Sequence, residues 1–139
     1  MVSKRIGLAA AVLVALGLLA LSGAACGDDD GVPAPPTVDV LAPIDELELI
    51  IRESFPPQYA ARVVSGLPDG CESFKSIEMD RAGNEFNITV TNERTTGEDV
   101  ACTQIYGTHE EVVELGSDLE PDETYVVRAN DRELTFTAQ

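Results

Sequence analysis

Three cysteines and one histidine are the residues of this 139-residue sequence best suited to covalent or metal chemistry. The first of them, Cys26, follows two basic residues, an apolar run over residues 6–21 and four small residues at 22–25. That order is typical of a secretory signal peptide, whose apolar core is shorter than the ~20 residues of a membrane-spanning helix. We therefore expect residues 1–25 to be a signal peptide, with Cys26 at the start of the exported chain.

A cysteine placed directly after small residues resembles the lipobox of bacterial lipoproteins. In that family a diacylglycerol is attached to the cysteine sulfur, and the cysteine becomes the first residue of the mature chain. The resemblance implies lipidation of Cys26, and an exported protein held at the cell membrane or cell envelope by its lipid. The family usually has leucine three residues before the cysteine, where this sequence has Gly23. Gly23 and Ala25 also suit the ordinary signal peptidase, which would release a soluble secreted protein.

Cys71 and Cys102 remain as an even pair once Cys26 is assigned to the lipid. Exported proteins fold in an oxidising environment, where such pairs form disulfides. We predict a disulfide between Cys71 and Cys102, which would stabilise the domain by about 3–4 kcal/mol in the chain-entropy model. The alternative is a pair of buried free thiols. A catalytic thiol is disfavoured because it needs a nearby base.

The single histidine does not complete a metal motif. His109-Glu110-Glu111 begins like the zinc-protease helix, which requires a second histidine four residues after the first. That position holds Val113. The acidic run at 28–30 lacks the spaced oxygens and the terminal glutamate of a calcium loop. We therefore predict no catalytic residue, no metal site and no cofactor, and we expect a protein that is not an enzyme.

The charge of the sequence limits the classes of partner. Cleavage before Cys26 would remove two of the nine basic residues and none of the 25 acidic residues, which leaves a net charge of −18. Such a charge repels the phosphates of nucleic acids and anionic lipid head groups. It excludes nucleic-acid binding and favours membrane contact through the lipid anchor alone. The remaining partners are an envelope protein or a cationic partner, although the same charge also serves solubility.

Prolines recur in the segment that follows Cys26. Four of them lie at positions 33, 35, 36 and 43, in a stretch with almost no apolar periodicity. Proline fixes φ and favours extended polyproline II, so we expect residues 26–43 to form a disordered, semi-rigid linker. At about 3.1 Å per residue, its reach is on the order of 50 Å. The remaining residues, 44–139, have the length of one folded domain.

Alternating apolar and polar residues predict β-strands throughout this domain. Phe86, Ile88 and Val90, for example, fall on one face of a strand at 85–91. The segment at 44–53 is ambiguous, because its apolar residues would also line one face of a helix. Turn sequences with glycine, proline or asparagine separate the segments. The seven expected strands are 47–52, 59–65, 74–79, 85–91, 111–115, 125–130 and 133–138.

The sequence from Leu119 to Val127 resembles the E–F corner of fibronectin type III and related immunoglobulin-like domains, typically Leu-x-Pro-Gly-Thr-x-Tyr-x-Val. Leu119, Pro121 and Tyr125 stand at its defining positions. The resemblance implies a structural tyrosine corner, in which the Tyr125 ring is buried and its hydroxyl bonds to the chain just upstream. Asp122 replaces the usual glycine, and no tryptophan is available for the usual core position. We expect an all-β fold, a small immunoglobulin-like β-sandwich of about seven strands, with a small barrel as the alternative.

Together these features predict an envelope-anchored lipoprotein that presents a non-enzymatic binding or accessory domain. Sandwich domains commonly bind through loops at their ends, and the predicted disulfide would join two such loops at 66–73 and 95–104. The alternative is a secreted inhibitor or chaperone-like β domain that acts through an exposed loop or edge strand. If the strand at 111–115 is an edge strand, the acidic stretch at 110–123 most simply protects it from pairing with another chain. The alternative is that the acidic stretch is a binding patch for a cation or a basic protein.

Overall fold

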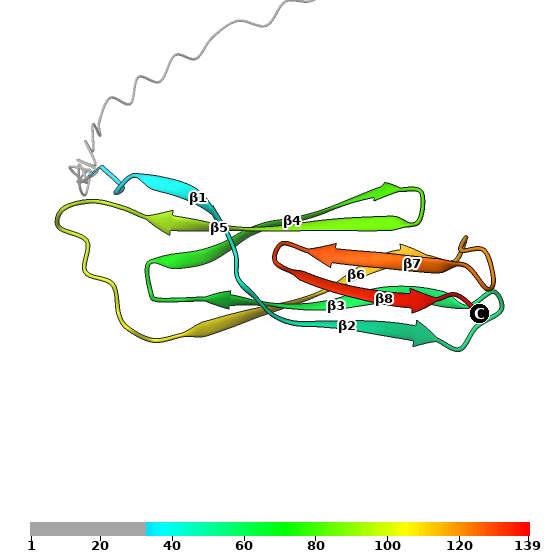
Figure 1. Cartoon of the computed structure of the whole chain (residues 1–139). Coiled ribbons are helices and arrows are strands. Elements are labelled where there is room, and N and C mark those ends of the chain that lie inside the picture. Colours follow the sequence, from blue (N-terminus) through cyan, green and yellow to red (C-terminus); the bar gives the residue numbers. More distant parts are fainter. Residues whose placement is uncertain (1–32) are drawn as a thin grey trace, which may run out of the picture. The chain divides into compact units, whose positions relative to one another are not determined.

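The computed structural model describes residues 33–139, and every regular element in that range is a β-strand (Figure 1). All seven predicted strands are present, and the ambiguous segment at 44–53 is a strand and not a helix. Within the described residues, no helix has the length and apolar character needed to cross a membrane. The strands are β1 (Thr37–Leu41), β2 (Ile44–Arg52), β3 (Gln58–Leu67), β4 (Glu72–Ala82), β5 (Glu85–Thr95), β6 (Gly107–Gly116), β7 (Thr124–Ala129) and β8 (Arg132–Thr137).

The strands form two sheets. The larger sheet contains β1, β4, β5, β7 and β8, and the smaller one has the order β2-β3-β6. Alternate residues of each strand face the space between the sheets, because successive side chains of a strand point to opposite faces. In β7, for example, Tyr125, Val127 and Ala129 are at most 1% exposed while the residues between them are half-buried. The prediction of an all-β sandwich is therefore confirmed.

Strand β5 lies at the centre of the larger sheet. The antiparallel strand β4 covers one side of it along nearly its whole length. The other side is shared, because β1 pairs antiparallel with residues 91–95 and β7 pairs parallel with residues 85–88. This parallel pair departs from the antiparallel sheets of an immunoglobulin domain. It arises because the chain passes through β6 of the opposite sheet between β5 and β7.

Strand β1 was not expected, since residues 26–43 were predicted to be a disordered linker. The structure corrects that boundary, because Thr37–Leu41 pair with β5 and the compact unit begins at Pro33. The strand was not predicted because prolines flank it and because only Val40 of its five residues is partly buried. Backbone pairing with a strand far along the chain holds β1 in place, and hydrophobic periodicity does not report such pairing. The predicted signal peptide and Cys26 lie outside the described residues.

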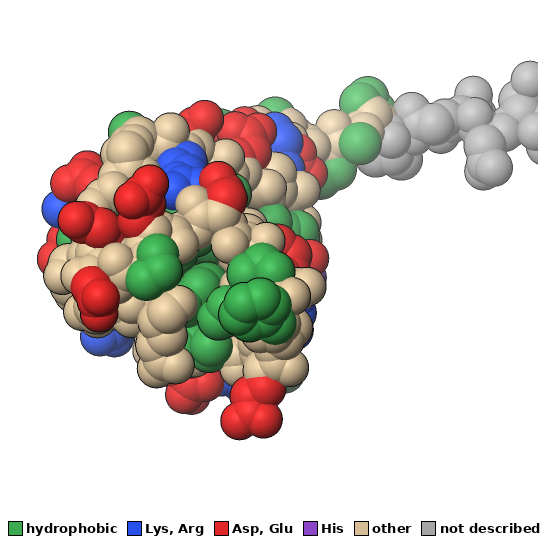
Figure 2. Space-filling model, turned by 90° about the vertical axis from the view of Figure 1, so that its right-hand side faces the viewer, with side chains coloured by type: hydrophobic (Ala, Val, Ile, Leu, Met, Phe, Trp, Pro, Cys, Tyr) green, Lys and Arg blue, Asp and Glu red, His purple; other side chains and the backbone are tan. Residues whose placement is uncertain are grey.

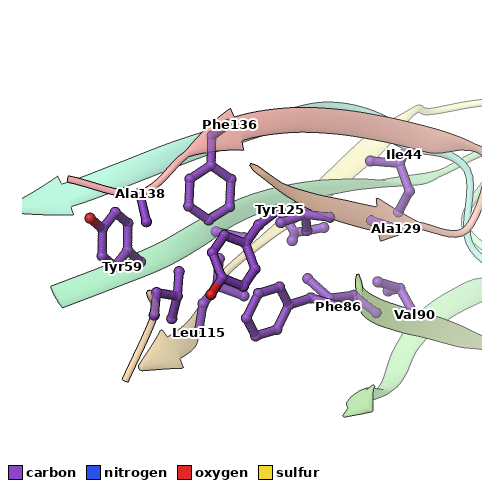
Figure 3. Packing of buried hydrophobic residues seen from close by; sticks show 14 of the residues in the cluster. Ile44, Tyr59, Phe86, Val90, Leu115, Tyr125, Ala129, Phe136 and Ala138 are labelled. Carbon is purple, nitrogen blue, oxygen red and sulfur yellow. The ribbon is translucent and has the colours of Figure 1, made fainter. Parts of the chain in front are cut away.

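Four aromatic rings form a row through the core (Figure 3). Tyr125 of β7 lies between Phe136 of β8, at a ring-centroid distance of 5.7 Å, and Phe86 of β5, at 6.1 Å. Phe136 in turn stacks on Tyr59 of β3, at 5.4 Å, so the row joins the two sheets. Such pairs contribute about 0.5–1.5 kcal/mol each beyond the area that they bury. The row supplies the large aromatic surface that a sandwich without tryptophan otherwise lacks.

The β7–β8 hairpin also completes the shared side of β5. Its first turn residue, Asn130, has a φ of 43°, a left-handed conformation that asparagine tolerates well. The Asn130 amide donates to the carbonyl oxygens of Val90 (2.8 Å) and Ala42 (2.7 Å). Its carbonyl oxygen accepts from the Val90 N–H at 3.1 Å. Asn130 thus pairs with β5 at the point between the end of β7 and the end of β1.

Candidate functional site

One end of the sandwich is closed by a disulfide. Cys71, in the β3–β4 connection, is bonded to Cys102, in the long β5–β6 connection, with a Cα–Cα distance of 5.2 Å. This is the predicted pairing, and it joins the two loops that the sequence placed together. A backbone hydrogen bond from Gly70 to Thr103 (2.9 Å) supports the same junction.

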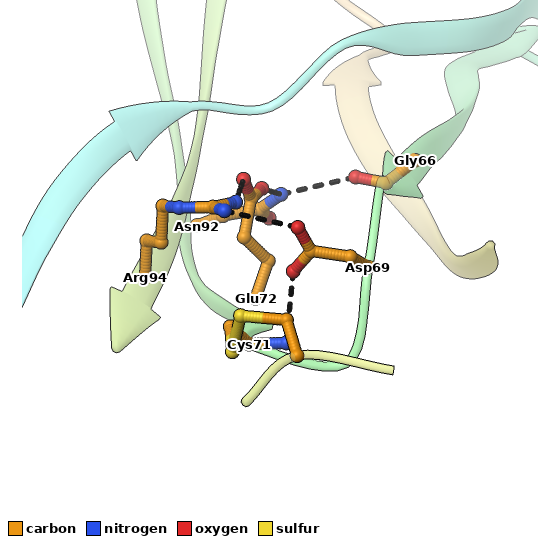
Figure 4. A network of polar contacts seen from close by, with 7 residues as sticks. Gly66, Asp69, Cys71, Glu72, Asn92 and Arg94 are labelled. Atoms are coloured by element: carbon orange, nitrogen blue, oxygen red, sulfur yellow. Dashed lines mark hydrogen bonds and ion pairs between the residues drawn. A yellow bond between two sulfur atoms is a disulfide. The ribbon is translucent and has the colours of Figure 1, made fainter. Parts of the chain in front are cut away.

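A polar cluster lies beside the disulfide (Figure 4). One carboxylate oxygen of Asp69 accepts from the backbone N–H of Cys71 (2.9 Å) and the other from Arg94 (2.9 Å). Glu72 accepts from Arg94 (2.6 Å) and from the amide of Asn92 (3.1 Å). The Glu72 side chain is only 8% exposed, so this ion pair is shielded from solvent more than an ordinary surface pair.

The electrostatics of the cluster stabilise its charged state. The backbone hydrogen bond from Cys71, followed by the contact with Arg94, lowers the pKa of Asp69. The hydrogen bonds that Arg94 donates to Glu72 and Asp69 raise the pKa of the guanidinium. Asp69 also lies near both cysteine sulfurs, but sulfurs joined in a disulfide offer no thiolate to a metal ion. The arrangement therefore fixes the loops and does not provide a metal site.

Asn92 anchors this cluster to the core. Its side chain is fully buried, and its amide also donates to the carbonyl oxygen of Gly66 at 3.0 Å. The Asn92 side-chain oxygen has no partner among the described residues. Asn92 was not predicted as a site residue, because it follows Phe86, Ile88 and Val90 on the buried face of β5. A buried amide at that position ties β5 to the end of β3.

The chain enters the domain at this same end. Thr96, which follows β5, donates both its backbone N–H (2.8 Å) and its hydroxyl (3.0 Å) to the carbonyl oxygen of Pro36. Pro36 directly precedes β1, so the start of the domain lies beside the disulfide-linked loops (Figure 1). We call this the tether end, formed by residues 33–36 and the connections at 68–71 and 96–106.

The tyrosine-corner residues lie at the opposite end, between β6 and β7. Tyr125 is 1% exposed, and its hydroxyl accepts a hydrogen bond from the Glu120 backbone N–H at 2.8 Å. Leu119 is buried and Pro121 is exposed. Asp122, which stands where the family pattern has glycine, has a φ of 64°. The position therefore requires the left-handed conformation that glycine adopts without cost, and aspartate tolerates it.

The β2–β3 loop lies at the same end and carries a fully exposed aromatic ring. Phe55 is 102% exposed, and Pro56 beside it is also exposed. Tyr59 links this loop to the corner, because it pairs with Gly116 at the end of β6 and its hydroxyl accepts from the Gln139 N–H at 2.8 Å. Figure 2 shows apolar side chains gathered on this end of the domain. Phe55 was not predicted from the sequence, where it appears only as an aromatic residue before two prolines at the end of a strand.

Acidic side chains are also present on this end of the domain, as the red atoms in Figure 2 show. We call the β2–β3 loop and the corner at 117–123 the distal tip. Two of the acidic groups near it are neutralised, because Arg52 binds Glu114 (2.6 Å) and Arg81 binds Asp118 (2.9 Å). Four exposed carboxylates at the tip form no ion pair within residues 33–139, namely those of Glu53, Glu120, Asp122 and Glu123.

His109 has a packing role. Its ring stacks on Phe74 of β4 at a centroid distance of 3.8 Å, and its Nε2 lies 3.2 Å from a carboxylate oxygen of Glu111. His109 and Glu111 lie on β6, which is an edge strand of the smaller sheet. Arg62 of β3 binds Glu110 on the outer face of the same strand at 2.7 Å, and this contact lowers the pKa of that carboxyl. Part of the acidic stretch is thus used in structural ion pairs.

Comparison with known proteins identifies one family. Residues 61–138, more than half of the chain, match the family described as the ORF11 beta-sandwich domain. The chain is also 30% identical over 88 residues to the "Uncharacterized 10.2 kDa protein in HgiCIIM 5'region" of Herpetosiphon aurantiacus. That alignment covers 63% of this chain and 90% of the relative. No solved structure matches the chain.

Proposed function

This chain belongs to the ORF11 β-sandwich domain family, and from that premise we propose that it is an exported lipoprotein whose sandwich serves as a non-enzymatic binding domain at the cell envelope. In this proposal Cys26 carries the lipid, and the segment between Cys26 and the tether end connects the anchor to the domain. The domain acts by contact with a partner, and the distal tip is the surface that it presents.

Two features support export. The first is the series of basic, apolar and small residues that ends at Cys26. The second is the disulfide between Cys71 and Cys102, because structural disulfides form and persist in oxidising compartments. The disulfide is also compatible with a protein that is secreted without an anchor. The lipid on Cys26 is therefore the feature that distinguishes the proposed lipoprotein from a secreted protein.

The observation that carries the binding role is the position of Phe55. The chain enters at the tether end, and Phe55 is 102% exposed at the other end of the sandwich. A domain held at its tether end presents the opposite end to the surroundings. The disulfide-linked loops, which sequence analysis favoured for recognition, lie beside the start of the domain and are less accessible in an anchored protein. We therefore propose the distal tip as the recognition surface, in place of the disulfide-linked loops.

The test of the anchor is mass spectrometry of the protein from a bacterial host with a lipoprotein pathway. We expect the membrane fraction to contain a chain that begins at Cys26 with a diacylglycerol on its sulfur. Cys26→Ser should move the protein out of the membrane fraction or stall the precursor, whereas Cys102→Ser should leave its membrane association intact. A wild-type protein that is wholly soluble with an unmodified Cys26 would contradict the proposal.

The exposed loop also favours a second candidate, a secreted inhibitor that inserts Phe55 into a pocket of its target. An inhibitor of this kind needs the loop but not the anchor. Fractionation of the wild-type protein therefore separates the two candidates, since only the lipoprotein remains with the membrane.

A further inference from the structure

We propose that the distal tip docks on a basic protein partner, with Phe55 filling an apolar pocket that Lys and Arg side chains of the partner surround. This inference rests on the proposed binding role and names the chemistry of the partner. It is carried by the exposure of Phe55, the rigidity of its loop and the charge around it.

Phe55 has the features of an anchor residue in a protein interface. Its ring is 102% exposed and is followed by Pro56, which is also exposed. Large aromatic side chains that insert into a partner pocket carry a large share of binding energy in protein complexes. Isolated exposed apolar residues are common on soluble proteins, so exposure alone does not identify a docking surface. The rigidity and the charge of the tip are the additional observations.

Hydrogen bonds and two prolines restrain this loop. Arg52, at the end of β2, makes two hydrogen bonds to the Glu114 carboxylate across the smaller sheet, at 2.7 and 2.6 Å. The Ser54 hydroxyl donates to the carbonyl oxygen of Pro56 at 2.7 Å. Two consecutive prolines restrict the backbone further. A loop that is already ordered loses little entropy on binding, so more of the contact energy appears as affinity.

The charge of the tip selects the kind of partner. Its two nearby guanidiniums, Arg52 and Arg81, are each engaged by a carboxylate. The four remaining carboxylates are exposed and without ion-pair partners in the described part of the chain, so the distal tip has a net negative charge. Contact between two copies of the tip would bring like charges together, and an anionic membrane would repel it. A surface rich in Lys and Arg is complementary.

The test uses a defined probe and the mature chain from residue 26 with Cys26→Ser. The probe is a synthetic amphipathic peptide of leucine and lysine, and a leucine–glutamate peptide of equal length is its control. NMR titration of backbone amides reports both the affinity and the place of binding. We expect the lysine peptide to bind at residues 53–57 and 117–123, with an affinity that falls as salt rises. The glutamate peptide should not bind.

Matched variants separate the tip from general attraction to an acidic protein. Phe55→Ser should weaken binding at least tenfold, whereas Ile105→Ser, which removes a 72% exposed apolar side chain at the tether end, should not. The double change Glu120→Gln with Glu123→Gln should weaken binding more than Glu98→Gln with Asp99→Asn, which removes two exposed charges elsewhere.

Three results would overturn the inference. The first is that the lysine peptide does not bind, or that the tip variants and their controls weaken its binding equally. The second is a concentration-dependent dimer in sedimentation that Phe55→Ser abolishes, which would make a second copy the occupant. The third is Phe55-dependent binding to vesicles of phosphatidylglycerol, which would make a membrane the occupant. Tip-specific peptide binding by a protein whose Cys26 is unlipidated would uphold this inference and refute only the anchor.

Discussion

Replacing Tyr125 by phenylalanine isolates the hydroxyl group of the tyrosine corner. The ring is 1% exposed, and its hydroxyl accepts the Glu120 N–H at 2.8 Å. A typical hydrogen bond contributes about 1 kcal/mol, and up to ~3 kcal/mol is lost when a buried group is left without a partner. The hydrogen bond is only partly buried, and we expect Tyr125→Phe to cost about 1–1.5 kcal/mol. Tyr125→Ala also removes the contacts with Phe86 and Phe136, and it should cost roughly 3–5 kcal/mol.

Urea unfolding of the mature chain with the disulfide intact measures these differences. Tyr106→Phe is the control, because its hydroxyl donates to Asp45 at 2.9 Å from a side chain that is 53% exposed. We expect this control to change the free energy of unfolding by no more than about 0.5 kcal/mol. The reasoning would be refuted if Tyr125→Phe and Tyr106→Phe had the same stability as the wild type. It would be refuted equally if Tyr125→Ala cost no more than Tyr125→Phe.

Three further predictions concern other parts of the fold. Asn130→Gly keeps the left-handed turn but removes three hydrogen bonds to Val90 and Ala42, so thermal unfolding should show a loss of about 1–3 kcal/mol. Reduction of the Cys71–Cys102 disulfide should lower the urea midpoint by the equivalent of about 2–4 kcal/mol, and thiol counting before reduction should find neither cysteine free. The pKa of Asp69 is lowered in the folded protein, so its contribution is present above about pH 4 and is lost as the pH falls through the folded value. Urea melts of Asp69→Asn and wild type should therefore converge as the pH falls below about 4, and a constant difference would contradict that assignment.

Most of the fold could be predicted from local sequence patterns. Tyr125 was recognisable because its corner is a short, contiguous signature, and Phe86, Ile88 and Val90 were assigned to the core because their alternation is strict. The turn between the last two predicted strands was also expected, and its Asn130 tolerates the left-handed conformation found there. The pairing of the two isolated cysteines followed from their number and the expected compartment.

Features that depend on pairing between strands far apart in the sequence could not be predicted from local patterns. Strand β1 is mostly exposed and joins a strand at least fifty residues away, beginning at Leu41↔Thr91, so it has no periodic signal of its own. The parallel contact of β5 with β7 depends on the path of the chain through the opposite sheet. Of the candidate site, the acidic stretch near the corner was noted, but Phe55 was not. Whether an aromatic side chain before two prolines is buried or exposed is decided by the packing around it.

The position of β1 also has a mechanical consequence. The strand, which pairs with β5 from Thr37↔Thr95 to Leu41↔Thr91, runs along the axis that joins the tether end to the distal tip (Figure 1). A pull between a membrane anchor and a partner held at Phe55 would act along this strand. Strand β1 continues directly into β2, which ends three residues before Phe55, so the covalent backbone of this segment carries such a force from one end of the domain to the other. The rest of the sandwich, which pairs with this segment through β5 and β3, would then bear little of the tension between the membrane and the bound partner.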